Sequence, residues 1–443
     1  MIRRRFLPLV LVSFAMLWMG CPREKTQQTD KREVAPGDPD LAIPYYTAIF
    51  QELGLDGGLS GQALIDAQNL PIALSFLGYS DVPPKDFENT VSADLNRRFP
   101  DAVLSAMYFA PKIVDVSVSP LNIGWRKVLR IKPRSGSSAE KLGVEAAYLL
   151  FNKFQGPGDV TTDPMTNESK NTQLIFTRGP TSTLPRAVYF LVYGPISEGD
   201  GKLKTYLEAS FDVRAPNIEE KTVNKYYVPN ACSECHGGSK DPDDDPTSED
   251  WQHIKINYLD TDHWFDRLDD DFAVLKTAPY GVLYDGGKDT TTTQFETAFD
   301  VVRRLNSEIR TQNQRVEVDP AIPSFQLRAV TKWVDLHKTD STHKNYFDRV
   351  LPSTSGPVWS ATSDPDKELL PLMNRYCYRC HSSLKYNVFD RPAVVRLTKN
   401  PASKPKIPDY LTRPETDPLR MPQDRVLDPP ALDNLITLFS RLK

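Results

Sequence analysis

The chain is poor in the residue types from which many functional sites are built. Its 443 residues include only five cysteines and six histidines, and no histidine occurs before His236. That long first part also contains no glycine-rich phosphate loop and no nucleophile elbow, so it carries no signature of a nucleotide-binding protein or a serine hydrolase. A chain of this length with five cysteines is not a small disulfide scaffold either.

The chain also lacks an excess of charge of one sign. It has 54 lysines and arginines against 58 aspartates and glutamates, a formal net charge of −4. No basic patch stands out, so nucleic acid is not expected as a partner. Hydrophobic residues make up 40% and charged residues 25%, ordinary values for a folded protein of two or three domains. The 37 prolines predict many loops and short elements.

The N-terminus has the pattern of an export signal. Three arginines precede the apolar run 6–19, and Gly20 stands directly before Cys21. The run is too short to span a bilayer comfortably as a helix, and the stretch 22–40 that follows is polar. We therefore expect residues 1–20 to be a signal peptide.

This segment resembles a bacterial lipoprotein signal. The resemblance implies that Cys21 becomes the lipid-bearing N-terminus of the mature protein, with residues 21–40 as a polar linker. It also implies a place at the periplasmic face of a bacterial membrane, inner or outer. The alternative is an ordinary cleaved signal peptide with an incidental Cys21.

The four cysteines beyond Cys21 form two copies of one motif, C-x-x-C-H. The copies are Cys232-Ser233-Glu234-Cys235-His236 and Cys377-Tyr378-Arg379-Cys380-His381. Two thiols one short turn apart can form thioether bonds with the vinyl groups of a porphyrin, and the adjacent imidazole can then bind the iron. The sequence therefore predicts two covalently bound haem c groups, attached by Cys232, Cys235, Cys377 and Cys380, with His236 and His381 as proximal metal ligands.

Three other uses of these cysteines fit less well. A structural zinc site brings its two pairs closer together in the chain, and here each pair ends in histidine. A thioredoxin-like pair needs one C-x-x-C that opens a helix in a βαβ unit, which neither copy shows. A disulfide across two intervening residues closes too small a loop to stabilise much.

A candidate sixth ligand follows the second motif. Met421 is the only methionine beyond His381, and Pro422 follows it. A thioether opposite an imidazole favours ferrous iron and raises the reduction potential, as an electron carrier requires. The alternative is a methionine that only packs in a loop.

Apolar stripes at helical spacing flank this second motif on both sides. They are Leu369, Leu370, Leu372 and Met373 upstream, and Leu432, Leu435, Ile436 and Phe439 in the terminal stretch 431–443. The order of helix, motif, Met-Pro loop and closing helix resembles a small monohaem cytochrome c domain over residues 361–443. The resemblance implies that His381 is the proximal ligand and Met421 the distal one.

The sixth ligand of the first haem is less clearly marked. No methionine follows His236 until Met373, but two histidines, His253 and His263, lie nearby. His263 is flanked by Trp264 and Phe265, so it can lie over an apolar haem face, and we predict it as a metal ligand. His253, a distant residue or an open iron are the alternatives. At an open iron, His263 would act as a distal acid or base.

Two further histidines, His337 and His343, are weaker candidates for that sixth position. His337 ends an expected amphipathic helix with a stripe of Phe325, Ala329, Trp333 and Leu336. A second helical stripe contains Phe295, Phe299, Val302, Leu305 and Ile309. Helices should therefore dominate the region between the motifs.

The rest of the chain predicts an α+β protein. Segments rich in β-branched and aromatic residues read as strands at 125–131, 172–176, 187–193 and 206–213, and 138–154 reads as a helix. We expect a mixed α/β domain of unknown role over 41–225, a mainly helical first haem domain over 226–355, and a cytochrome c-like helical domain over 356–443.

The chain as a whole looks like a dihaem c-type cytochrome. We expect it to exchange electrons with a redox partner protein in the periplasm, with a lipid anchor in the membrane. A dihaem oxidoreductase, in which the second haem feeds a catalytic first haem, is the enzyme alternative; its analogy to dihaem cytochrome c peroxidases depends largely on motif spacing. A haem-based sensor is the third hypothesis.

Overall fold

The structure is a computed structural model. The residues that it describes are 42–89, 98, 102–115, 122–155, 171–194, 197–199, 202–204, 210–213, 224–228, 255–256, 259, 292–317, 320, 325–338, 359–360, 362–377, 391–399, 406–414, 421 and 427–443. The predicted signal peptide, Cys21 and the linker lie outside these residues.

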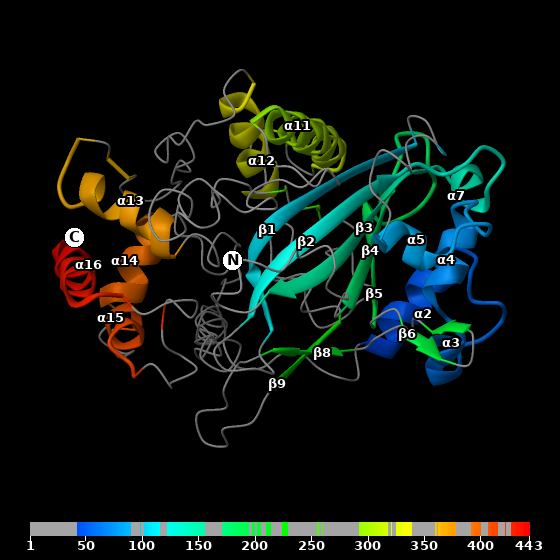
Figure 1. Ribbon diagram of the computed structural model, residues 1–443, viewed down its shortest axis with the longest axis horizontal. Coiled ribbons are helices and arrows are strands. Elements are labelled where there is room, and N and C mark those ends of the chain that lie inside the picture. Colours follow the sequence, from blue (N-terminus) through cyan, green and yellow to red (C-terminus); the bar gives the residue numbers. More distant parts are fainter. Residues whose placement is uncertain are drawn as a thin grey trace, which may run out of the picture.

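A five-stranded antiparallel sheet forms the centre of the molecule (Figure 1). Its strands follow one another in chain order: β1 (Val103–Asp115), β2 (Asn122–Ile131), β3 (Val144–Gln155), β4 (Asn171–Arg178) and β5 (Val188–Tyr193). Leu129, Leu149, Leu174 and Leu191 are successive register partners across four strands. Two small hairpins, β6 (Ser197–Gly199) with β7 (Lys202–Lys204) and β8 (Ser210–Val213) with β9 (Asn224–Tyr227), lie outside this sheet.

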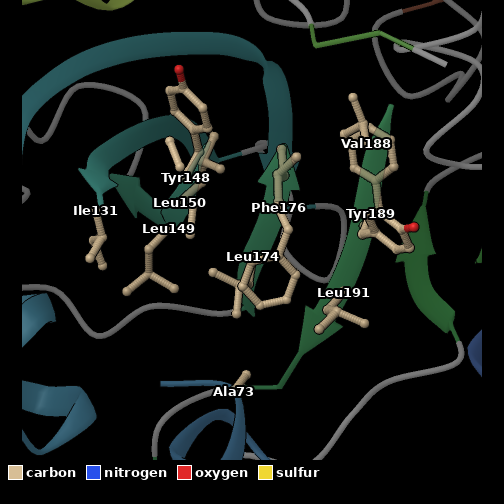
Figure 2. Close-up of a cluster of buried hydrophobic side chains, with 14 of the residues drawn as sticks. Ala73, Ile131, Tyr148, Leu149, Leu150, Leu174, Phe176, Val188, Tyr189 and Leu191 are labelled. Carbon is tan, nitrogen blue, oxygen red and sulfur yellow. The ribbon is translucent and has the colours of Figure 1, made fainter. Parts of the chain in front are cut away.

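Helices cover both faces of the sheet. On one face lie α2 (Ala42–Glu52), α3 (Gly61–Ala67), α4 (Leu70–Phe76) and α5 (Pro84–Asn89), and on the other α11 (Thr292–Arg315) and α12 (Phe325–Leu336). Leu149, Leu174 and Leu191 point toward Ala73 of α4, whereas Tyr148 points the opposite way (Figure 2). The Tyr148 hydroxyl donates to Gln312 of α11. The buried side chains of the sheet and of these six helices form one core, here called the sheet cluster.

A second, smaller core lies among the last four helices, at one end of the molecule (Figure 1). These are α13 (Asp366–Tyr376), α14 (Arg391–Lys399), α15 (Lys406–Leu411) and α16 (Pro429–Arg441). We call the buried residues of this core the C-terminal cluster: Trp359, Leu369, Leu370, Met373, Val394, Leu411, Leu427, Leu435, Leu438, Phe439 and Leu442. The predicted terminal helix and the apolar segment before the second motif are thus both confirmed as helices.

Helices and an antiparallel sheet together confirm the mixed α+β class. The predicted strands 125–131 and 172–176 lie within β2 and β4, β5 covers 188–193, and β8 covers 210–213 of the predicted 206–213. Both helical stripes predicted between the motifs lie in α11 and α12.

One predicted element is wrong. The stretch 138–154 is not one helix, because the short helix α7 (Ser138–Lys141) ends before Gly143 and strand β3 begins at Val144. Gly143 has a φ of +76°, and a Cβ there would lie 2.8 Å from the Cα of Ser182. The run from Tyr148 to Phe151 is apolar throughout because β3 is covered on both faces.

The turn at Gly143 generates a stability prediction. Gly143→Ala should lower the free energy of unfolding by about 2–4 kcal/mol, because alanine meets both an unfavourable φ and the backbone of Ser182. Gly136→Ala is the matched control, with a φ of +80° but nothing within 4 Å of the added Cβ. It should cost only about 1 kcal/mol. Urea unfolding followed by circular dichroism measures both; equal losses would contradict the close contact at Gly143.

Candidate functional site

The structure describes two of the predicted haem-site residues, Cys377 and Met421. The other predicted site residues lie outside the described part of the chain: Cys21, Cys232, Cys235, His236, His253, His263, His343, Cys380 and His381. Their roles stay predictions. The described residues do, however, show the helix at whose end the second motif begins.

Cys377 caps the C-terminal end of helix α13. Its backbone N–H donates to the carbonyl of Met373 at 2.7 Å, so the helical hydrogen bonding continues up to the first cysteine of the motif. Leu369, Leu370 and Met373 are buried, and Cys377 is half-buried and packs against the same cluster. Met373 therefore faces the core, as its position predicts. The thiol of Cys377 lies at the boundary between an apolar core and the surface.

Met421 is held by the helix that lies nearest before it in the chain, α15. Its backbone N–H donates to the carbonyl of Tyr410 at 2.9 Å. Tyr410 is itself fixed from one side, since the Arg413 guanidinium lies 4.8 Å from the centre of its ring. Arg413 also pairs with Asp409 at 2.6 Å. Met421 is half-buried, so its thioether is not part of the fully buried core.

The closing helix α16 packs against α13, which Cys377 caps, and against α15, to which Met421 is hydrogen-bonded. Its N-terminus is capped by Asp428, whose side chain accepts from the backbone N–H of Ala431 at 2.7 Å. Leu435 and Phe439 on its inner face are buried in the C-terminal cluster. Cys377 and the residue to which Met421 is hydrogen-bonded, Tyr410, therefore lie on helices that share one apolar core.

A buried ion pair joins the first residues of α13 and α14. Arg391, at the start of α14, donates from Nε to Asp366 at 2.8 Å, and both side chains are less than a tenth exposed. Asp366 also accepts the backbone N–H of Ser360, and Arg391 donates to the main-chain carbonyl of Lys443 at 2.9 Å. The guanidinium lies 5.7 Å from the ring centre of Trp359. One arginine thus joins the starts of two helices to the end of the chain.

The donor chemistry of this region fits a c-type haem. A thiol at a helix end beside an apolar core and the thioether of a half-buried methionine are the kinds of protein group that such a haem uses for attachment and axial ligation. Among the described residues, no group of three or more His, Cys, Asp and Glu side chains is placed to hold a metal ion. Nor does the described part of the chain include a helix with the length and apolar character to cross a membrane.

His337, a weaker candidate for the first haem, is fully buried at the end of α12. Its ring centre lies 4.6 Å from that of Trp333, and its backbone N–H donates to the carbonyl of that residue. These contacts place it in the helical layer on the sheet. Its role as a ligand stays a prediction.

Sequence reasoning missed a buried charged group on the opposite face of the sheet. Lys153 pairs with Glu88 at 3.1 Å, and Lys127 donates to the Glu88 carbonyl at 2.7 Å. Burial, reinforced by the positive charge of Lys153, lowers the pKa of Lys127 to about 7. A signal was present, since Lys127 lies two residues before Leu129 and four before Ile131 in β2, and therefore on the same buried face of the strand.

The ion pair in the C-terminal cluster generates a second prediction. Arg391→Met should lower the free energy of unfolding by about 3–5 kcal/mol, because it leaves the Asp366 carboxylate buried without its charged partner. Asp366→Asn combined with Arg391→Met should lose less, since no buried charge is left over. The control is Lys367→Met, which removes the exposed pair with Asp364 and should change stability by less than about 1 kcal/mol. Urea titrations compare the variants; an Arg391→Met loss no larger than that control would contradict the prediction.

Comparison with known proteins identifies no relative. No family model matches the chain, and neither a curated protein nor a solved structure matches it. The candidate function of this protein therefore follows from its own motifs and contacts.

Proposed function

We propose that the protein is an exported dihaem c-type cytochrome that transfers electrons in the periplasm. The observation that carries the proposal is the pair of C-x-x-C-H motifs, which use all four cysteines after Cys21. Cys232 and Cys235 attach the first haem c, and Cys377 and Cys380 attach the second. His236 and His381 are the proximal ligands.

Several contacts support the second haem site. Cys377 ends a helix whose inner face is buried, so one attachment thiol is held rigidly at the margin of an apolar core. The core excludes water from that side of the site, and exclusion of water is one of the factors that tune haem potential. Haem c supplies a one-electron ferric and ferrous couple when bound. We also propose that residues 356–443 form a cytochrome c-like helical domain, of which α16 is the last helix.

Met421 is the proposed distal ligand of the second haem. Its backbone hydrogen bond to Tyr410 fixes its position relative to α15, and its side chain is only half-buried, so the thioether is available to bind a haem iron. A thioether ligand stabilises the ferrous state. The chain would therefore hold the second haem at a raised potential, suited to electron acceptance.

Two segments of the sequence support a proposal for the partner and the location. We propose that lipidated Cys21 tethers the protein to a bacterial membrane and that the polar linker 21–40 separates the folded part from it. The acidic stretch 241–250 would present negative charge to a basic redox partner protein. His263 remains the proposed sixth ligand of the first haem.

Haem counting tests the proposed attachment. The wild-type protein, produced with export and haem maturation, should carry two covalently bound haems, seen as two haem masses in denaturing mass spectrometry. Cys232→Ala with Cys235→Ala should leave one, and so should Cys377→Ala with Cys380→Ala, because each pair of thiols forms its own thioether bonds. A wild-type chain without covalent haem would overturn the proposal.

The ligand proposal makes a spectroscopic prediction. Met421→Ala should abolish the charge-transfer band between methionine sulfur and ferric iron and lower the potential of one haem, because a thioether ligand is lost. Met373→Leu is the matched control, a buried methionine of the same cluster that should keep the band. If the band survives Met421→Ala, Met421 is not the distal ligand.

Electron paramagnetic resonance of the oxidised protein then tests electron transfer against catalysis. Two low-spin signals and no reaction with peroxide support a carrier with both irons six-coordinate. A high-spin first haem that reacts with peroxide contradicts it.

A further inference from the structure

A short stretch that follows the first motif is bound to helix α11 by two buried asparagines. The side chain of Asn306 both donates to the carbonyl of Leu259 at 2.9 Å and accepts from its N–H at 2.8 Å. Asn313 donates to the carbonyl of Ile256, also at 2.9 Å. Both asparagines are about 1% exposed or less, and Ile256 and Leu259 are buried in the sheet cluster. Such amides replace the backbone partners that a buried chain would otherwise lack.

The spacing of these contacts shows how the stretch lies. Asn306 and Asn313 are seven residues apart, about 10 Å along a helix. Ile256 and Leu259 are three residues apart, and three residues of chain can span up to about 11 Å. Asn313, the later residue of the helix, contacts Ile256, the earlier residue of the stretch, and Asn306 contacts Leu259. The stretch therefore runs antiparallel to α11.

An ion pair extends this alignment by one more step. Lys255 pairs with Glu317, just beyond the end of α11, at 3.4 Å, and both side chains are less than a twentieth exposed. Burial lowers the pKa of Lys255, and the Glu317 carboxylate acts in the opposite direction. Three contacts in register, from Leu259 to Lys255, therefore hold the stretch along the helix.

Helix α11 is itself anchored on its other side to the sheet. Glu308 pairs with Arg130 at 3.1 Å, and Arg315 pairs with Glu145. Gln312 accepts from Tyr148 at 3.3 Å and donates to Thr177 at 3.2 Å. A helix held on two sides by buried polar groups can act as a rigid support for the stretch beside it.

The supported stretch lies close in sequence to the first haem motif and to its proposed sixth ligand. Val228, four residues before Cys232, is fully buried in the same sheet cluster. Leu259 stands four residues before His263, and four residues of chain span at most about 14 Å. The described chain is thus fixed both before and after the first motif.

We propose that Asn306, Asn313 and Glu317 are positioning residues for the first haem, which hold Lys255, Ile256 and Leu259 in place and so keep the axial ligand supplied by the following chain on the iron. The inference rests on the proposed function and deepens it. These residues act through the chain that they bind, with no contact to the iron.

Cyanide titration of the oxidised protein with two haems attached tests this role. Loss of a hydrogen bond from Asn306 or Asn313 to the stretch should raise the fraction of molecules in which the axial ligand has left the iron. The apparent affinity of the first haem for cyanide rises with that fraction. Asn313→Ala, which removes one hydrogen bond, should raise the affinity about tenfold, and Asn306→Ala, which removes two, about a hundredfold. Paramagnetic resonance should show a matching gain of high-spin signal at that haem.

Gln312→Ala provides the matched control. It removes two buried hydrogen bonds from the same helix, next to Asn313, but on the side facing the sheet. The cyanide affinity of the first haem should stay within about twofold of wild type. Circular dichroism and urea unfolding report whether each variant is folded.

Three outcomes would overturn the positioning role. They are no change with either asparagine variant, an equal change with Gln312→Ala, and a wild-type first haem that already binds cyanide as an open site. Haem counting keeps this test separate from that of the proposed function, because a chain with two covalent haems can still fail every arm of the titration.

Discussion

Helix α11 must satisfy buried polar partners on two sides at once, and much of the molecule depends on how it does so. Toward the sheet it offers Glu308 and Gln312, and toward the stretch after the first motif it offers Asn306 and Asn313. An unpaired buried amide or guanidinium, such as that of Arg130, costs more than its hydrogen bond contributes, so neither side can shift without disturbing the other. The sheet and the chain near the first motif are therefore fixed in one arrangement.

The sequence predicts elements well where only one structure explains the pattern. The stripe of α16 and the β-branched stretches of β2 and β4 are of this kind. The run from Tyr148 to Phe151 is not, because an apolar run fits a buried helix or a strand covered on both faces equally well. Only the layers of helices on the two sides of β3, brought together by the whole fold, decide between them.

Some features of the candidate site can be predicted from a local sequence motif, and others depend on contacts between distant residues. Haem attachment is a local chemistry of two thiols and an imidazole, so its motif can be read from five consecutive residues. The placement of Met421 by Tyr410 and the pairing of Arg391 with Asp366 depend on contacts between separate helices. No spacing rule relates these residues in the sequence. The sequence is therefore enough to propose Met421 as a ligand, whereas the contacts that position it could not be predicted.

The two regions for which haem binding is proposed differ in how they obtain a core. The described part of 356–443 has its own cluster, built from α13 to α16. The described part of 226–355 shares the core of the sheet, since Val302, Leu305 and Val330 pack in the same cluster as Leu149. Helix α12 contacts both cores, because Trp333 lies in the sheet cluster while Ala329 packs against the C-terminal one. If both haems are bound, the N-terminal sheet acts as the structural support of the first, and α12 links that support to the second.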